Sequence, residues 1–324
     1  MPIDDKYLNL LKNEKNLLAF SHGSDSSALF FMLLEKNIEF DLALINYKTR
    51  LNSDIEEQSA KELAKKYNKK IYIKIAPKIE KNFEANARVV RYEFFDEICF
   101  KYGYKNLILA HNLNDKFEWF LMQFSKGAGL FELLGFKDIE KRKNFTIVRP
   151  LIETSKKEIL KFLNDKKIKY FHDESNDNEK YFRNHIRINY ANEFLLEFEK
   201  GIKNSFKYLQ NDLSFFDDNF KIFHGIYICL KQENIIAKCF KHLGILLSTK
   251  QRQEALKHDG VISHKIAIVY MYDKALIFPF IKCEKIPKEF RENCRKMKIP
   301  KLLRAFCFLK DISLKELNQA LDSF

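Results

Sequence analysis

A short polar segment between an apolar run and a helix-like stretch contains residue types that bind phosphate. The segment consists of Ser21, His22, Gly23, Ser24, Asp25 and Ser26. Its hydroxyls and backbone N–H groups can point at an anion, together with the positive end of the following helix dipole. The carboxylate of Asp25 would repel a bare anion, so it indicates a magnesium ion beside the phosphates. The segment predicts a nucleotide site, with an ordinary Ser/Asp helix cap as the alternative.

Two further groups of ionisable residues could act on phosphates or on a proton. Arg88 and Arg91 share a helix face with Glu84, and each could bind phosphate oxygens through two parallel hydrogen bonds. Asp115 and Glu118 are three residues apart on a helix and could line one pocket. Each group also has a plainer interpretation, as exposed arginines paired with glutamates or as a solvated helix face.

The charge distribution favours a polyanionic partner. The 324 residues include 57 Lys and Arg against 44 Asp and Glu, a net charge of +13. The segment 281–310 alone has ten Lys or Arg residues against three Glu. Near residue 185, Arg183, His185 and Arg187 stand beside Tyr181 and Phe182, a mixture common in RNA contacts. The alternatives are that codon usage enriches lysine throughout the chain and that residues 181–187 only begin an interdomain helix.

Apolar runs alternate with helical patterns over the first half of the chain. The expected strands are 17–20, 38–46, 70–76, 106–110 and 146–151, and the expected helices are 28–35, 53–67, 83–98, 115–124 and 155–164. Such an alternation, with almost continuously apolar strands, is typical of a parallel sheet covered on both faces. Ligands bind at the carboxyl ends of such strands, where the 21–26 segment and His111 both lie. His111 could also be a core histidine.

The pattern therefore predicts an α/β fold with a doubly wound, mainly parallel sheet and smaller C-terminal α+β or helical domains. The expected divisions are 1–188 for a nucleotide-binding domain, 189–222 for a helical linker region and 223–324 for a small, basic C-terminal region that could contact nucleic acid. No apolar stretch reaches the ~18 residues of a membrane span, and no signal peptide is evident, so a cytoplasmic protein is expected. The absence of CxxC, GxxxxGK[ST] and GxGxxG excludes CxxC-based zinc ribbons, Walker loops and dinucleotide-type sites.

Several motifs in order resemble those of one enzyme family. The 21–26 segment is similar to the S-G-G-x-D-S signature of the PP-loop, adenine nucleotide alpha hydrolase-like enzymes. Four further segments resemble motifs of the tRNA(Ile)-lysidine synthetases: E-x-x-A-R-x-x-R-Y-x-F-F at 84–95, A-H-H-x-D-D-Q-x-E at 110–118, R-P-L at 149–151 and D-x-[ST]-N…[YF]-x-R-N-x-[IL]-R at 173–187. A further R-G-[SA]-G-L…L-x-G likeness covers 126–135. The resemblance is strong over residues 17–190 and weak beyond.

This resemblance implies a ligase that joins free L-lysine to the wobble cytidine of isoleucine tRNA with a CAU anticodon, through an adenylated cytidine. ATP and Mg²⁺ are the implied cofactors, and a homodimer is left open. The implied catalytic residues are Asp25, Arg88, Asp115 and Glu118, with Asp25 and Asp115 as metal ligands. The implied ATP-binding residues are Ser21, His22, Gly23, Ser24, Asp25, Ser26 and His111. The implied tRNA-binding residues are Arg183, Asn184, Arg187, Arg295, Lys298 and Arg304.

Three residues depart from the family pattern. His22 replaces a glycine, Asn112 a histidine and Asn114 an aspartate. They keep two alternatives open. One is another PP-loop enzyme such as a tRNA cytidine thiolase, although thiolation would call for paired cysteines. The other is a non-catalytic RNA-binding protein with a decayed ATP site.

Overall fold

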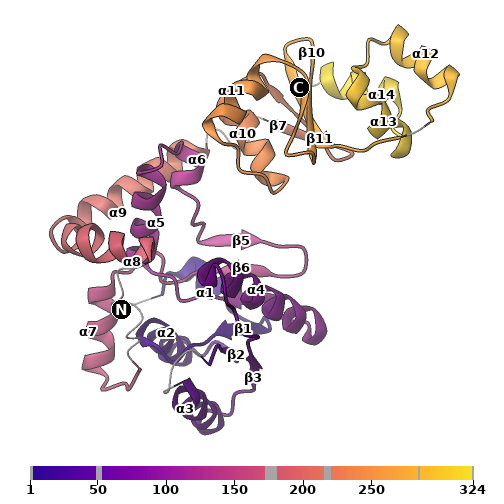
Figure 1. Ribbon diagram of the computed structural model, residues 1–324. Coiled ribbons are helices and arrows are strands. Elements are labelled where there is room, and N and C mark those ends of the chain that lie inside the picture. The colour runs from indigo at the N-terminus through magenta and orange to yellow at the C-terminus, as the bar shows by residue number, and fades with distance from the viewer. Residues whose placement is uncertain (1–2, 49–52, 172–180, 215–219, 284, 323–324) are drawn as a thin grey trace. The chain divides into compact units, whose positions relative to one another are not determined.

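The computed structural model describes residues 3–48, 53–171, 181–214, 220–283 and 285–322. The chain divides into two compact units (Figure 1). Unit 1 comprises Met1–Ala128 and Glu132–Phe206, and unit 2 comprises Gly129–Phe131 and Lys207–Phe324. The division of the sequence into 1–188, 189–222 and 223–324 stays a prediction about how the chain folds in parts.

Unit 1 is built on a mainly parallel sheet, as the sequence predicts. Its strands are β1 (Asn16–Ala19), β2 (Phe40–Asn46), β3 (Ile71–Ile75), β4 (Asn106–Ile108), β5 (Ile139–Lys141) and β6 (Thr146–Val148). Among the described residues their order is β3-β2-β1-β4-β6-β5. Only β5 pairs antiparallel, in a hairpin with β6 at one edge of this described sheet (Figure 1). The sequence did not predict β5.

Helices connect these strands and continue beyond them. They are α1 (Asp5–Leu11), α2 (Ser24–Glu35), α3 (Ser53–Lys66), α4 (Phe83–Tyr102), α5 (Leu113–Phe124), α6 (Leu130–Leu133), α7 (Lys156–Asp165), α8 (Phe182–Ile186) and α9 (Asn192–Ser214), with a π-helical turn, η2 (Arg187–Ala191), before α9. Asn112 and Ser155 begin α5 and α7 with capping boxes. Ser155 with Glu158 is a capping-box pattern that the sequence alone shows, as is Ser53 with Glu56 at the start of α3.

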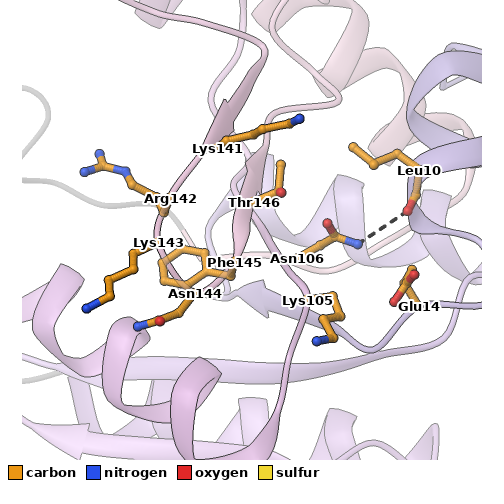
Figure 2. A pocket seen from close by; sticks show the side chains of 10 residues that line it. All are labelled: Leu10, Glu14, Lys105, Asn106, Lys141, Arg142, Lys143, Asn144, Phe145 and Thr146. Atoms are coloured by element: carbon orange, nitrogen blue, oxygen red, sulfur yellow. Dashed lines mark hydrogen bonds between the residues drawn. The ribbon is translucent and has the colours of Figure 1, made fainter. Parts of the chain in front are cut away.

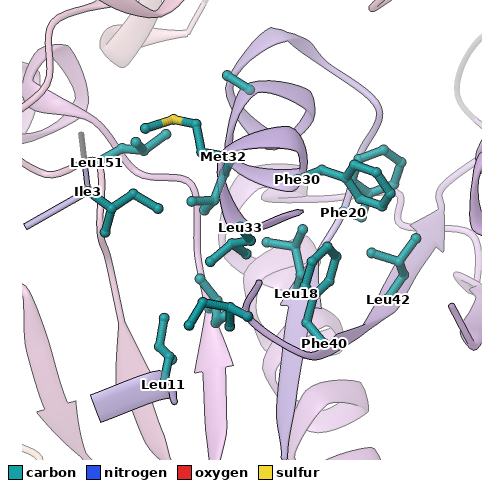
Figure 3. Close-up of a cluster of buried hydrophobic side chains, with 14 of the residues drawn as sticks. Ile3, Leu11, Leu18, Phe20, Phe30, Met32, Leu33, Phe40, Leu42 and Leu151 are labelled. Carbon is teal, nitrogen blue, oxygen red and sulfur yellow. The ribbon is translucent and has the colours of Figure 1, made fainter. Parts of the chain in front are cut away.

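Successive residues of each central strand enter different cores. In β1, Leu18 packs with α1, α2, α3 and α7, whereas Leu17 packs with Phe94 and Ile98 of α4. Figure 3 shows Leu18 of the sheet beside Leu33 of α2. Because side chains alternate between the two faces of a strand, both faces must be covered by apolar groups. This burial explains the continuous apolar runs and confirms the doubly wound fold.

Unit 2 contains an antiparallel sheet with helices on both faces. Its strands are β7 (Phe220–Phe223), β8 (Ile226–Leu230), β9 (Gly260–Ile262), β10 (Ile266–Met271) and β11 (Lys274–Pro279), and their order in the described chain is β7-β8-β11-β10-β9. Its helices are α10 (Glu233–His242), α11 (Thr249–Lys257), α12 (Lys288–Lys296), α13 (Lys301–Leu309) and α14 (Leu314–Asp322). One face packs on α10 and α11 and the other on α12, α13 and α14, which makes this the predicted C-terminal α+β part.

Within the described ranges, no helix combines the length and the apolar content that crossing a membrane requires.

Candidate active site

The polar segment after β1 forms a compact loop that leads into α2. The Ser26 hydroxyl lies 3.1 Å from that of Ser21 and donates to the Gly23 carbonyl at 3.2 Å. The N–H of Gly23 donates to the Ser21 hydroxyl at 3.3 Å. Gly23 is the N-cap of α2 and supplies no side chain to cap the first N–H groups of the helix. These groups therefore stay directed at any anion bound in front of the loop.

His22 has a left-handed backbone and a buried ring. Its φ is +58°, and its ring is 5% exposed, with centroids 5.1 Å from the rings of Phe20 and Phe171. Burial lowers the pKa of His22, so its ring is neutral at neutral pH. Glycine adopts this φ at no steric cost, which explains why the PP-loop signature has a glycine at the position of His22. The ring packs in the core, so only the backbone of His22 faces the loop.

Lys156, which the sequence analysis did not single out, joins this loop to the start of α7. Its ammonium donates to the Ser24 hydroxyl at 2.6 Å and to the Asp25 carboxylate at 2.7 Å. Its backbone N–H donates to the side-chain oxygen of Asn114 at 2.9 Å. Asn114 thus serves as a hydrogen-bond acceptor, and the aspartate of the family pattern could accept the same bond. The signal that could have revealed Lys156 is its place directly after the predicted cap residue Ser155, at the carboxyl edge of the sheet.

Asp25 lies near one positive and one negative side chain, Lys156 and Asp115. Burial raises its pKa, the ammonium of Lys156 lowers it, and the nearby Asp115 raises it, with a net upward shift. The structure therefore brings the two carboxylates predicted as metal ligands into one electrostatic environment. No cluster of three or more metal-binding side chains occurs among the described residues.

His111 is a neutral hydrogen-bonding group in this site. The Nε of Arg149 donates to the Nδ1 of His111 at 3.2 Å, so the proton of the neutral ring lies on Nε2. Burial lowers the pKa of His111 to about 3, and the positive charge of Arg149 contributes to the shift. His111 is thus a donor through Nε2 and stays uncharged across the neutral range.

Two carboxylates of α5 hold two arginines that follow more than 60 residues later in the chain. Arg183 contacts Asp115 at 2.6 Å and Glu118 at 2.8 Å. Arg187 contacts Glu118 at 2.6 and 3.0 Å. Burial would raise the pKa of Asp115, but Arg183 and His111 lower it, and the net shift is downward. Two of the predicted catalytic carboxylates and two of the predicted tRNA-binding arginines therefore form one charge-balanced group. Asn184, which follows Arg183, is buried.

Comparison with known proteins adds to this geometry. A family model described as a PP-loop domain matches residues 3–194. The chain is 55% identical to the tRNA(Ile)-lysidine synthase of Campylobacter jejuni, over 98% of this chain and 100% of that relative. The chain belongs to the tRNA(Ile)-lysidine synthase family.

Two further comparisons agree with this membership. The tRNA(Ile)-lysidine synthase of Helicobacter pylori is 42% identical over 92% of this chain and 90% of its own length. The solved structure of a tRNA thiolase from Methanococcus maripaludis has a TM-score of 0.53 and 18% identity, and covers 63% of this chain and 74% of that one. The thiolase likeness shows the shared PP-loop fold and no more.

In this lysidine synthase family member, the two arginines of α4 face different groups. The Nε of Arg91 donates to the Tyr47 hydroxyl at 3.3 Å, and its charge adds to the effects that lower the pKa of His111, of which burial is the largest. Arg88 is exposed, and its guanidinium lies over the ring of Tyr92 at 4.8 Å. Arg91 therefore contributes positive charge near His111, while the role predicted for Arg88 stays a prediction.

The remaining predicted tRNA-binding residues lie in unit 2. Arg295 and Lys298 are exposed near the end of α12, and Arg304 is half-buried with its Nε donating to the Ile299 carbonyl at 3.0 Å. The family motif at 173–176 lies outside the residues that the structure describes.

Proposed function

We propose that this chain joins L-lysine to the wobble cytidine of isoleucine tRNA with a CAU anticodon, as an ATP-dependent ligase that forms lysidine. Family membership carries the proposal as far as lysidine formation on tRNA(Ile) with ATP. One observation in the fold supports it further. The PP-loop carboxylate Asp25, the His111 ring and the Asp115–Arg183 pair all lie at the carboxyl edge of one parallel sheet. In such sheets that edge is where ligands bind.

ATP would bind with its phosphates in front of α2. The first N–H groups of that helix, the hydroxyls of Ser21, Ser24 and Ser26, and the ammonium of Lys156 supply the donors and the positive charge. Lys156 already contacts Ser24 and Asp25, and those two contacts hold its ammonium beside the loop. We assign Lys156 to the polyphosphate of ATP, in addition to the residues that the motif names.

The residues fit a magnesium ion that is held mainly by phosphate oxygens. Magnesium usually takes one or two protein carboxylates together with substrate phosphates. We assign Asp25 as the direct ligand, since both oxygens of Asp115 already accept bonds from Arg183 and from the Asn112 N–H. Asp115 would then act on the ion through its charge. When bound, magnesium would neutralise phosphate charge and stabilise the leaving group.

The reaction proposed for this site has two steps. The carbonyl oxygen of the cytidine attacks the α-phosphorus of ATP, an oxygen–phosphorus bond forms, and pyrophosphate leaves. The amine of lysine then attacks the activated carbon, a carbon–nitrogen bond forms, the carbon–oxygen bond breaks, and AMP leaves as the amine loses a proton. Lys156 and the start of α2 stabilise charge on the departing pyrophosphate, and the Nε2–H of His111 is a neutral donor at the same edge.

Arg183, Asn184 and Arg187 would position the tRNA near the reacting groups. The ion pairs of Arg183 and Arg187 with Asp115 and Glu118 hold the guanidinium planes in fixed orientations, which favours contact with a cytidine or its phosphate. Arg295, Lys298 and Arg304 would add phosphate contacts elsewhere on the tRNA. The enzyme would work where its tRNA is, in the cytoplasm. A homodimer stays a prediction, which analytical ultracentrifugation of the purified chain checks.

Incorporation of labelled lysine into tRNA tests the proposal. The purified chain is incubated with ATP, labelled L-lysine and isoleucine tRNA bearing a CAU anticodon, and a tRNA with uridine at the wobble position serves as the control. Label in the first tRNA alone is the expected result. ATP–pyrophosphate exchange that depends on the cytidine-bearing tRNA would identify the adenylated step. Exchange without lysine incorporation would favour another PP-loop modification, and loss of both would favour a non-catalytic RNA-binding protein.

A further inference from the structure

A cavity lined mainly by polar residues lies at the edge of the unit 1 sheet opposite the candidate active site. It has a volume of about 350 Å³ and is formed where the β5–β6 hairpin turns beside the start of β4 (Figure 2). Its lining consists of Leu10, Glu14, Lys105, Asn106, Lys141, Arg142, Lys143, Asn144, Phe145 and Thr146. The candidate active site lies where these parallel strands end, whereas this cavity lies where they begin. None of the family motifs described above includes the hairpin turn.

Three of the four basic residues that line the cavity are not ion-paired within the described residues. Arg142 pairs with Glu140 at 2.6 Å. The ammonium groups of Lys105, Lys141 and Lys143 have no hydrogen-bond or ion-pair partner within the described part of the chain. Glu14 supplies the carboxylate of the lining. Figure 2 shows these side chains around the hairpin turn and the start of β4. Cations without counterions raise the local potential and attract anions.

The backbone of this site is fixed by the sheet. The N–H of Arg142 donates to the Phe145 carbonyl at 2.9 Å and closes the hairpin turn, and the N–H of Thr146 donates to the Lys105 carbonyl at 2.9 Å. The amide of Asn106 donates to the side-chain oxygen of Asn16 at 2.9 Å. The lysines therefore project from a rigid frame, which reduces the ordering that a ligand would have to impose.

We infer that this cavity binds phosphate groups of the tRNA backbone and is a second RNA contact of unit 1. The inference rests on the proposed function, in which tRNA is the substrate. A free nucleotide has the same phosphate chemistry but would also need a surface for its base. The apolar lining is only Leu10 and Phe145, and Phe145 is 5% exposed, so its ring offers little area for stacking. Backbone phosphates need no such surface.

The spacing suits one RNA that reaches both edges of the sheet. β6 joins Thr146 at the cavity to Arg149 beside His111. At roughly 3.3 Å per residue these positions are about 10 Å apart along the strand. Because most of β6 is buried, an RNA has to pass around the sheet, and this length is the least distance that it must cover. Stacked nucleotides advance by roughly 3.4 Å each along one strand of a duplex, so the distance corresponds to a few nucleotides or more. A tRNA whose wobble base enters the active site would have neighbouring phosphates within reach of the hairpin.

Binding of tRNA at two salt concentrations tests the inference. The double variant Lys141→Ala with Lys143→Ala is compared with Lys65→Ala with Lys66→Ala, which removes two exposed lysines from α3 beside β2 on the other side of the sheet. We expect the hairpin variant to bind tRNA about tenfold more weakly at low salt. The salt slope, which is the slope of the logarithm of the binding constant against the logarithm of the salt concentration, should be smaller in magnitude by about two. The control variant should match the wild-type protein in both measurements.

Three outcomes overturn the inference or separate it from the proposed function. Equal affinity and salt slope in the two variants would overturn it. Binding of ATP or inorganic tripolyphosphate that only the hairpin variant loses, with unchanged tRNA binding, would identify a free-phosphate site and overturn it as well. Lysine incorporation by the wild-type protein is measured in parallel. If that reaction is absent while the hairpin variant still loses tRNA affinity, the proposed function fails and the RNA contact stands.

Discussion

Asp25 shows at the scale of one residue how a functional charge can weaken the fold that contains it. Burial raises its pKa and outweighs the opposing effect of Lys156, so the ionised carboxylate is less favourable in the folded protein than in the unfolded chain. At neutral pH, Asp25→Asn should therefore unfold at an equal or higher temperature than the wild-type protein. The activation free energy of adenylation should nevertheless rise by about 2–4 kcal/mol, because a charge that stabilises the transition state is lost.

Thermal melting and ATP–pyrophosphate exchange measure the two effects separately. Asp165→Asn, which removes an exposed carboxylate from the end of α7, is the control and should leave both unchanged. An Asp25→Asn protein with near-native exchange would show that Asp25 has no part in the reaction.

His111 should make the stability of the fold depend on pH. Its pKa is about 3 in the folded protein and 6.5 in the unfolded chain, so only the unfolded chain takes up a proton as the pH falls below 6.5. Stability is then lost progressively from pH 6.5 down to about 3. His111→Asn keeps an acceptor for Arg149 but cannot titrate. Between pH 7 and pH 5, the wild-type protein should lose about 2 kcal/mol more unfolding free energy than the variant in urea titrations. Equal losses would contradict the assignment.

At the scale of elements, the first turn of α7 should combine a structural and a catalytic role. Ser155 caps the helix through a capping box with Glu158, and the next residue, Lys156, contacts Ser24 and Asp25. Ser155→Ala should cost about 1 kcal/mol of stability and should also raise the KM for ATP, because the lysine loses its fixed position.

A second capping box in unit 2 provides a matched control for that substitution. Ser248 caps α11 with Gln251 in the same geometry. Ser248→Ala should cost a similar free energy of unfolding and leave the KM for ATP unchanged. Identical ATP kinetics in the two variants would mean that the cap of α7 does not position Lys156.

At the scale of the whole molecule, the basic C-terminal segment belongs to the core of unit 2. Leu303, Phe306 and Leu317 are each 2% exposed or less and pack against the sheet of that unit. Deletion of 281–324 would therefore expose this core, and a loss of tRNA binding in such a truncation would reflect unfolding. Its role in RNA binding has to be tested through exposed charges.

Arg295→Ala with Lys298→Ala removes two exposed charges near the end of α12 without touching that core. We expect weaker tRNA binding and a smaller salt slope, measured at two salt concentrations, with ATP affinity unchanged because the ATP site consists of unit 1 residues. Arg295→Ala alone should act mildly, since no single phosphate contact dominates. An unchanged salt slope in the double variant would mean that Arg295 and Lys298 do not contact tRNA phosphates.

The sequence by itself determined the features that depend on neighbouring residues. Strands covered on both faces leave continuous apolar runs, a helix cap needs Ser155 and Glu158 three residues apart, and a PP-loop is one short segment between a strand and a helix. These local signals were enough for the doubly wound fold, the edge that holds the site and the family.

Only the tertiary structure decided which charged groups meet. Asp25 and Lys156 are 131 residues apart, and Asp115 and Arg183 are 68 apart. It also decided that the ring of His22 packs in the core, that Arg91 donates to the Tyr47 hydroxyl and that Arg88 lies over Tyr92. The physical reason is that a local pattern sets only the helix or strand face of a side chain. Its partners and its pKa depend on the distant elements that packing brings against that face.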